Sequence, residues 1–157
     1  YSNFETPFTQ VFIFGFPRSG TTLLDNIFDT QPKVTVLSEE PTVSSIIQFM
    51  ETKLNKRYPL DLPKLSEKDI TALRNAYFDT IKSIGSQIIE DGVLVDKHPH
   101  VTKDLPLLKI LFPNAKYILS LRNPMAVCFS CFQTDFIKNE SNIIILFIML
   151  ILILKLF

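Results

Sequence analysis

The stretch FIFGFPRSGTTLL, residues 12–24, carries the residues whose types and spacing are best suited to chemistry. Gly15 and Gly20 have the spacing of the glycines in a phosphate-binding GxxxxG loop. Such a turn from strand to helix directs backbone N–H groups at one point, where the helix dipole also favours an anion. The lysine of a nucleotide-triphosphate loop is absent, because position 21 is Thr21, whereas Arg18 offers a planar guanidinium inside the loop. The pattern predicts a site for a phosphate- or sulfate-bearing group that needs no metal.

Two more polar clusters follow short apolar runs that are typical of strands. DKHP, residues 96–99, comes after the run at 93–95, and RNP, residues 122–124, comes after the run at 116–121. The glycine-containing loop likewise follows the run QVFIF, residues 10–14. Ligands of parallel α/β sheets lie at the carboxyl ends of the strands. We therefore expect the three clusters at one edge of a sheet.

The elements that must position these clusters alternate between strand-like and helix-like patterns. Strands are predicted over residues 10–14, 34–37, 93–95 and 116–121. Helices are predicted from the loop to about Asp29, over 42–53, from Ser66 to about Glu90, over 105–112, and from Pro124 onwards. In the first helix, one apolar stripe is expected to comprise Leu23, Leu24, Ile27 and Phe28. The alternation predicts the α/β class, with a mainly parallel sheet flanked by helices.

Composition limits the classes of partner. The 157 residues suit one domain, and 16 basic residues balance 16 acidic ones. No overall field therefore draws the chain to nucleic acid or to an anionic membrane. The two cysteines, Cys128 and Cys131, cannot form a disulfide framework or a zinc ligand set, and we expect them to pack inward from one helix. Their scarcity favours a reducing, cytoplasmic compartment, with Golgi or membrane-attached locations left open.

The end of the chain differs from the rest, because residues 143–154 are twelve apolar residues in a row. A membrane-spanning helix needs about 17 to 25 residues. Three interpretations stay open: a clipped membrane anchor, a buried final element, or non-native sequence such as a frameshift product. The chain begins with Tyr1 rather than Met, so we expect a fragment or a processed product.

The segment GFPRSGTTLL resembles the phosphosulfate-binding loop of sulfotransferases that use 3′-phosphoadenosine 5′-phosphosulfate (PAPS). Three downstream segments agree with it in order: VDKHP, LFPNAKYILSLRNP and RNPMAVCFSC. Arginine in the loop makes the chain similar to the tyrosylprotein and bacterial TPR-linked branches. The resemblance implies a P-loop NTPase-like sulfotransferase fold that is incomplete at the C-terminus. It implies two parts: residues 1–136 form the N-terminal part of a sulfotransferase domain, and residues 137–157 form an apolar tail of non-family sequence or a short membrane segment.

The resemblance also implies roles for individual residues. The phosphosulfate would be bound by the loop residues Arg18, Ser19, Gly20, Thr21 and Thr22. The 3′-phosphate would be bound by Arg122 and Ser130, and the latter reaches it only if the helix from Pro124 folds back over the site. No metal is expected.

By the same resemblance, catalysis would depend on Arg18, Glu39 and Lys97. Lys97 would stabilise the departing phosphate with Arg18, and Asp96 would orient Lys97. Counting without gaps favours Glu39 as the base that takes the acceptor proton, with Glu40 as the alternative.

The resulting hypothesis is transfer of a sulfuryl group from PAPS to a hydroxyl acceptor, with protein tyrosine among the candidates. The alternative is a non-catalytic, truncated or membrane-attached product. A nucleotide kinase or NTPase is less favoured, because Thr21 replaces the phosphate-binding lysine. The sequence does not predict the acceptor or the oligomeric state.

Overall fold

A computed structural model of the chain describes residues 4–133. Its centre is a four-stranded sheet in the order β2-β3-β1-β4. The strands are β1 (Thr9–Gly15), β2 (Val34–Ser38), β3 (Val93–Lys97) and β4 (Lys116–Ser120). All three pairings are parallel, so the carboxyl ends of the strands lie at one edge. The predicted α/β class with a parallel sheet is confirmed.

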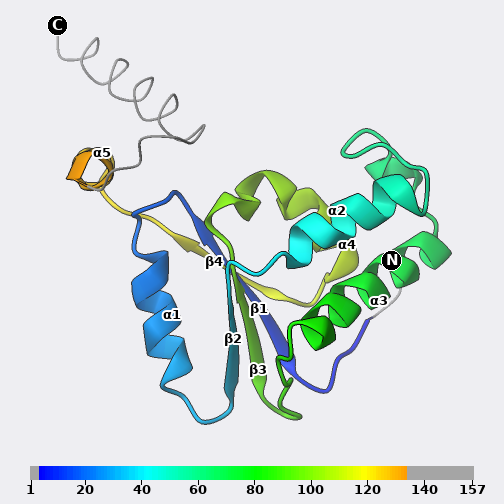
Figure 1. The fold of residues 1–157 in the computed structure, drawn as a ribbon, viewed down its shortest axis with the longest axis horizontal. Helices are drawn as coiled ribbons and strands as arrows, with labels where there is room; N and C mark the ends of the chain where they lie inside the picture. Colours follow the sequence, from blue (N-terminus) through cyan, green and yellow to red (C-terminus); the bar gives the residue numbers. More distant parts are fainter. Residues whose placement is uncertain (1–3, 134–157) are drawn as a thin grey trace, which may run out of the picture.

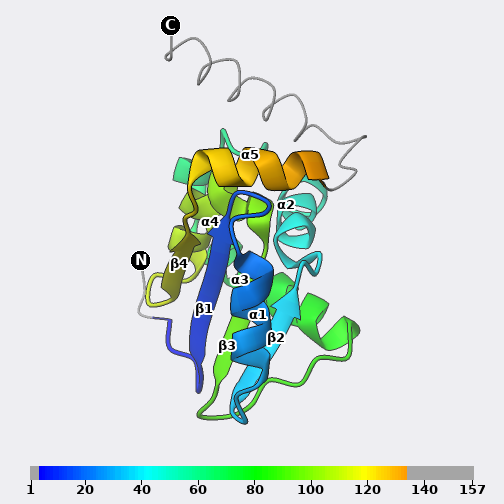
Figure 2. The same cartoon turned by 90° about the vertical axis from the view of Figure 1, so that its left-hand side faces the viewer.

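Helices cover both faces of the sheet (Figure 1). They are α1 (Thr21–Asp29), α2 (Thr42–Thr52), α3 (Glu67–Ser83), α4 (Leu105–Leu111) and α5 (Pro124–Gln133), with 3₁₀ turns η1 (Leu62–Lys64) and η2 (Pro99–Asp104). One face carries α1, and the other carries α2, α3 and α4. Figure 2 shows α5 lying across the end of the sheet, above the β1–α1 loop. The carboxyl ends of the strands are thus bordered by α1 and α5.

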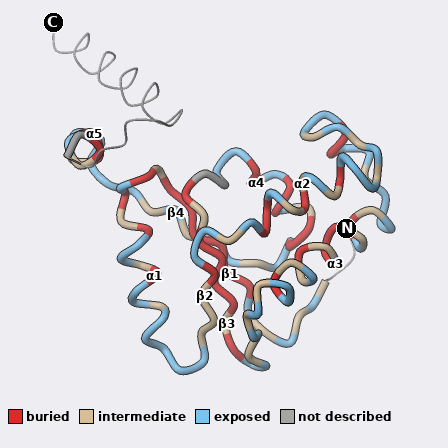
Figure 3. Tube along the Cα trace, in the orientation of Figure 1, coloured by how far each residue is buried: buried red, intermediate tan, exposed pale blue. Residues whose placement is uncertain are grey.

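Strand β1 lies between β3 and β4, and its side chains are buried on both faces of the sheet. Phe12 belongs to the core beneath α2, α3 and α4, whereas Val11 and Ile13 belong to the smaller core beneath α1. A parallel strand covered on both faces is expected to be continuously apolar, which explains the run QVFIF. Buried residues accordingly run along β1 and β3 in Figure 3.

The helix predicted from Ser66 to Glu90 is correct at its start and wrong at its end. Ser66 and Asp69 form a reciprocal capping box at the start of α3. The helix stops at Ser83, and Gly85 has a left-handed backbone with φ of 76°. Ile88 still packs against the main core from the following loop. The apolar spacing therefore continues past the point where the helix ends.

The apolar stripe predicted for α1 is wrong for half of its members. Leu24 and Phe28 pack on the sheet, but Leu23 is 64% exposed and Ile27 is 52% exposed. The side facing the sheet includes a buried acidic residue, Asp25. A polar residue thus occupies the face that the pattern assigned to apolar side chains.

Helix α5 packs through both cysteines, as predicted. Cys128 and Cys131 are buried and reduced, and they contact Val127 and Phe16. Within residues 4–133, no group formed by three or more of the described His, Cys, Asp or Glu side chains could hold a metal ion. In the same range, none of the helices has the length and hydropathy to cross a membrane. The apolar tail at residues 137–157 lies outside the described residues.

Candidate anion-binding site

The loop between β1 and α1 approaches β4 so closely that it excludes side chains at its first glycine. A Cβ on Gly15 would lie 2.6 Å from the carbonyl oxygen of Ser120 and 2.8 Å from Ser19 Oγ. Further along the loop, Arg18 and Gly20 have left-handed backbones, with φ of 68° and 106°. A non-glycine residue in that region is uncommon and is enriched at functional sites.

The N-terminus of α1 has unmet hydrogen-bonding capacity. Its N-cap is Gly20, and no side chain of the described residues caps it. The first N–H groups of a helix have no partner within the helix, and the dipole places positive charge there. Thr21 is buried and Thr22 is exposed, so the second hydroxyl is the more accessible. This terminus has the donors that an anion requires.

Ser19 connects the loop to β4. Its carbonyl oxygen accepts a hydrogen bond from Ser120 Oγ at 3.0 Å. The hydroxyl oxygen of Ser19 is itself buried and has no hydrogen-bond partner within the described part of the chain. An unpartnered buried polar atom beside an uncapped helix terminus fits a loop shaped for a ligand with hydrogen-bonding oxygens.

Two arginines distant in sequence meet beside this loop. Arg122 Nη1 donates to the carbonyl oxygen of Arg18 at 3.0 Å, and Arg18 Nε donates to Ser130 Oγ at 3.1 Å. Ser130 reaches the loop because α5 crosses over it (Figure 2). The start of α5 is capped by Asn123, whose side-chain oxygen accepts hydrogen bonds from two of the first N–H groups of the helix. The structure thus brings together the residues predicted for the two phosphate positions.

A second cluster surrounds the buried ammonium group of Lys97, at the end of β3. This side chain is 2% exposed, and its Nζ lies 2.9 Å from Glu39 Oε1 and 3.0 Å from Asp25 Oδ2. Burial alone lowers the pKa of Lys97, but the hydrogen bonds that its ammonium group donates to Glu39 and Asp25 outweigh burial, and the pKa is raised overall. Lys97 is therefore charged at neutral pH.

Glu39 rather than Glu40 contacts Lys97. Its backbone N–H donates to the Lys97 carbonyl oxygen at 2.8 Å, and its φ is 60°. The carboxylate is thus held by a left-handed turn directly after β2. Its side chain is 57% exposed, so a molecule arriving from solvent can reach it.

Asp96 does not orient Lys97, and that prediction is wrong. Successive side chains of a strand point to opposite faces, which sends Asp96 into the main core. There its Oδ2 accepts hydrogen bonds from Thr42 at 2.8 Å and Tyr77 at 2.9 Å. Burial raises the pKa of Asp96 to about 6. The side chain that contacts Lys97 from the buried side is Asp25.

Asp25 is not among the site residues predicted from the sequence, because the apolar spacing indicated that the inner face of α1 is apolar. Its position is nevertheless informative, since it follows Thr21 by four residues and precedes Phe28 by three. Residues at these spacings share one side of a helix. A carboxylate on the sheet-facing side of α1 indicates a buried cation nearby.

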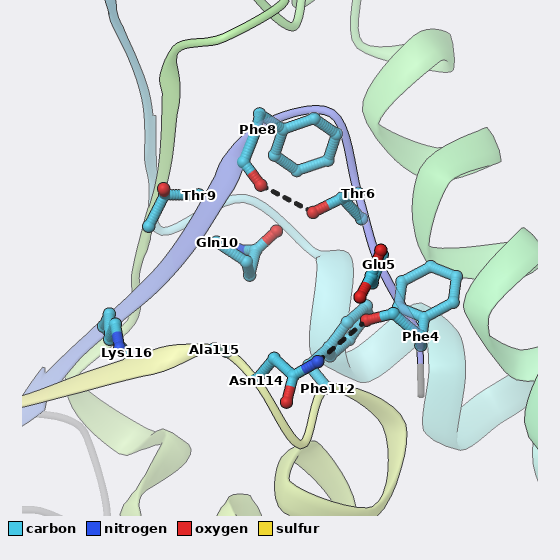
Figure 4. A pocket seen from close by; sticks show the side chains of 10 residues that line it. All are labelled: Phe4, Glu5, Thr6, Phe8, Thr9, Gln10, Phe112, Asn114, Ala115 and Lys116. Atoms are coloured by element: carbon cyan, nitrogen blue, oxygen red, sulfur yellow. Dashed lines mark hydrogen bonds between the residues drawn. The ribbon is translucent and has the colours of Figure 1, made fainter. Parts of the chain in front are cut away.

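A cavity of about 260 Å³ lies at the other end of the strands (Figure 4). Its lining includes Thr9, Gln10 and Lys116, at the starts of β1 and β4, together with Phe4 and Phe112. The predicted site residues occupy the carboxyl ends of the strands instead. The cavity is therefore separate from the site.

Comparison with known proteins agrees with the resemblance in the motifs. The model of the sulfotransferase family matches residues 10–143. Human protein-tyrosine sulfotransferase 1 is 29% identical over 123 residues, which cover 74% of this chain and 32% of that protein. Protein-tyrosine sulfotransferase A of Caenorhabditis elegans is 32% identical over 130 residues, covering 79% and 32%.

The similarity extends to bacterial proteins. An uncharacterized protein of Aquifex aeolicus is 31% identical over 138 residues, which cover 84% of this chain and 18% of that protein. The solved shikimate kinase of Bacteroides thetaiotaomicron aligns at 12% identity, with a TM-score of 0.42, over 90% of this chain and 75% of that one. The chain spans about a third or less of the length of these three relatives. Because the family model covers most of the chain, this protein belongs to the sulfotransferase family.

Proposed function

We propose that this chain forms the donor-binding part of a sulfotransferase that moves a sulfuryl group from PAPS to a hydroxyl acceptor. The observation that carries the proposal is the meeting of Arg122, Arg18 and Ser130 beside the uncapped terminus of α1. Two groups of anion donors, which come from segments about a hundred residues apart, thereby lie next to each other. A nucleotide with phosphates on its 3′ and 5′ positions matches two neighbouring sites of this kind.

The donor's two ends would use different chemistry. The phosphosulfate would accept hydrogen bonds from the N–H groups at the start of α1 and from Thr22, with Ser19 and Gly20 forming the turn. The 3′-phosphate would pair with Arg122 and Ser130. Charge-assisted hydrogen bonds from guanidinium groups are stronger than neutral ones, so both arginines should contribute strongly to affinity.

The Lys97 cluster supplies what the transfer step needs. The bond between sulfur and the bridging oxygen of the donor breaks, and a bond forms between sulfur and the acceptor oxygen. The acceptor hydroxyl gives its proton to Glu39, whose exposed carboxylate is accessible. Negative charge develops on the departing phosphate, and the ammonium of Lys97 and the guanidinium of Arg18 stabilise it.

The acceptor class is inferred from the relatives. Several are protein-tyrosine sulfotransferases by name, and one is the nodulation protein NoeE. A phenolic hydroxyl of a protein tyrosine is therefore the acceptor that we propose to try first. The exposure of Glu39 suits a bulky acceptor that arrives from solvent.

Calorimetric titration with adenosine 3′,5′-bisphosphate tests the proposal without requiring turnover. We expect saturable one-to-one binding, and a loss of about tenfold or more in affinity for both Arg18→Ala and Arg122→Ala. Arg57→Ala is the matched control, because Arg57 is an exposed arginine in the loop between α2 and α3. No binding by the parent chain, or equal losses in all three variants, would contradict the proposal.

A further inference from the structure

Lys97 has two carboxylate partners that differ greatly in exposure. The Asp25 side chain is 7% exposed, whereas that of Glu39 is 57% exposed, and both lie within 3.0 Å of Lys97 Nζ. A single carboxylate would suffice to neutralise one ammonium group. The presence of two, one buried and one accessible, calls for a division of roles.

The orientation of Asp25 is fixed from two sides. Its Oδ2 accepts from Lys97 Nζ at 3.0 Å and from Ser38 Oγ at 2.7 Å. Its Oδ1 is buried and has no hydrogen-bond partner in the described range 4–133. Helix α1 and the end of β2 therefore hold this carboxylate against the end of β3.

The exposed partner alone cannot keep Lys97 charged through a reaction. A base that takes up a proton becomes neutral, and its attraction to the neighbouring ammonium group then falls. A buried ammonium without a counter-charge is strongly disfavoured. Two other acidic groups lie nearby. Asp96 is on the opposite face of β3, where it accepts hydrogen bonds from Thr42 and Tyr77. The charge of Glu40 raises the pKa of Asp96. Asp25 is the carboxylate that contacts Lys97 from the buried side.

We propose that Asp25 is a positioning residue, a permanent counter-charge that keeps Lys97 protonated and in place while Glu39 gains and loses the acceptor proton. This inference rests on the proposed function, because the proton that Glu39 exchanges is that of the proposed acceptor. The arrangement of charges itself does not depend on PAPS. Lys97 would thus remain ready to stabilise the departing phosphate throughout the transfer.

NMR of the ¹⁵N-labelled lysine ammonium groups, followed against pH, tests this on the free chain. In Glu39→Gln we expect the proton affinity of Lys97 to fall less than in Asp25→Asn, because water screens the exposed Glu39 carboxylate. In Asp25→Asn we expect the proton affinity of Lys97 to fall by about tenfold or more, because a buried charge loses its counter-charge. Lys82, which pairs with Asp79 on the surface at 3.6 Å, serves as an internal reference, and Asp79→Asn is the matched variant. Equal effects of the two substitutions on Lys97, or a larger one in Glu39→Gln, would overturn the proposal.

A second variant covers the case in which Asp25→Asn does not fold. Removing one partner of a buried ion pair is more damaging than removing both. The double variant Asp25→Asn/Lys97→Met should therefore regain cooperative urea unfolding. If the double variant is no more stable than Asp25→Asn alone, Asp25 acts through packing and not through charge, and the proposal fails.

The two proposals can fail separately. Adenosine 3′,5′-bisphosphate titration of the same samples reports on donor binding, whereas the ammonium signals report on Lys97. A chain that binds no nucleotide but shows the expected asymmetry would contradict only the proposed function. A chain that binds nucleotide without the asymmetry would contradict only the role of Asp25.

Discussion

Asp96 illustrates how a residue next to the site can act on stability instead of chemistry. It is buried in the main core, and its pKa is raised to about 6 from an ordinary value of 3.8. A carboxyl group with a raised pKa stabilises the fold when protonated. This contribution is fully present below pH 3.8 and is lost as the pH rises through 6. At neutral pH, where this contribution is lost, the free energy of unfolding is lower by about 3 kcal/mol than it would be with Asp96 protonated.

Asp96→Asn tests this effect at the residue scale, because asparagine cannot ionise. We expect the stability of the variant relative to the parent to fall by about 2 kcal/mol as the pH is lowered from 7 to 4. Urea unfolding at several pH values measures the difference. Asp79→Asn, which changes an exposed carboxylate, is the control and should shift the unfolding free energy by less than about 1 kcal/mol. A difference for Asp96→Asn that is independent of pH would contradict the assignment.

The β1–α1 loop is the element to which we assign the binding of the sulfuryl donor. Gly15→Ala would push a methyl group against Ser120 and Ser19, so the loop must move. We expect a loss of about 1–3 kcal/mol in unfolding free energy and a clear loss of affinity for adenosine 3′,5′-bisphosphate. Gly85→Ala is the control, because Gly85 has φ of 76° and open space around it. It should cost about 1–2 kcal/mol and leave affinity unchanged. Urea unfolding and calorimetric titration measure the two effects. Equal affinities of the two variants for adenosine 3′,5′-bisphosphate would contradict a role of the loop in binding it.

At the level of elements, the sequence predicted the order of strands and helices well because each has a local cause. The buried run QVFIF and the Ser66 capping box are examples. The end of α3 was not predictable, since the apolar spacing continues to Ile88 while Gly85 turns the backbone away. The inner face of α1 was also misjudged, because its acidic residue is buried only by virtue of a lysine that lies 72 positions further along the chain.

At the scale of the whole molecule, the motifs predicted which residues would gather but not how they pair. The meeting of Arg18, Arg122 and Ser130 follows from a parallel sheet whose strands end at one edge. The hydrogen bond from Arg18 to Ser130 depends on how α5 crosses the loop, which no local pattern specifies (Figure 2). The two carboxylate partners of Lys97 likewise come from separate segments, helix α1 and the turn after β2.

We propose that the carboxyl ends of the strands form one site for a nucleotide with two phosphates. Backbone amide NMR of the ¹⁵N-labelled chain, titrated with adenosine 3′,5′-bisphosphate, tests it most directly. We expect saturable shifts that are largest at residues 18–22 and 122–130. Largest shifts around the cavity at the opposite end of the strands, at residues 4–10 and 112–116, would contradict it.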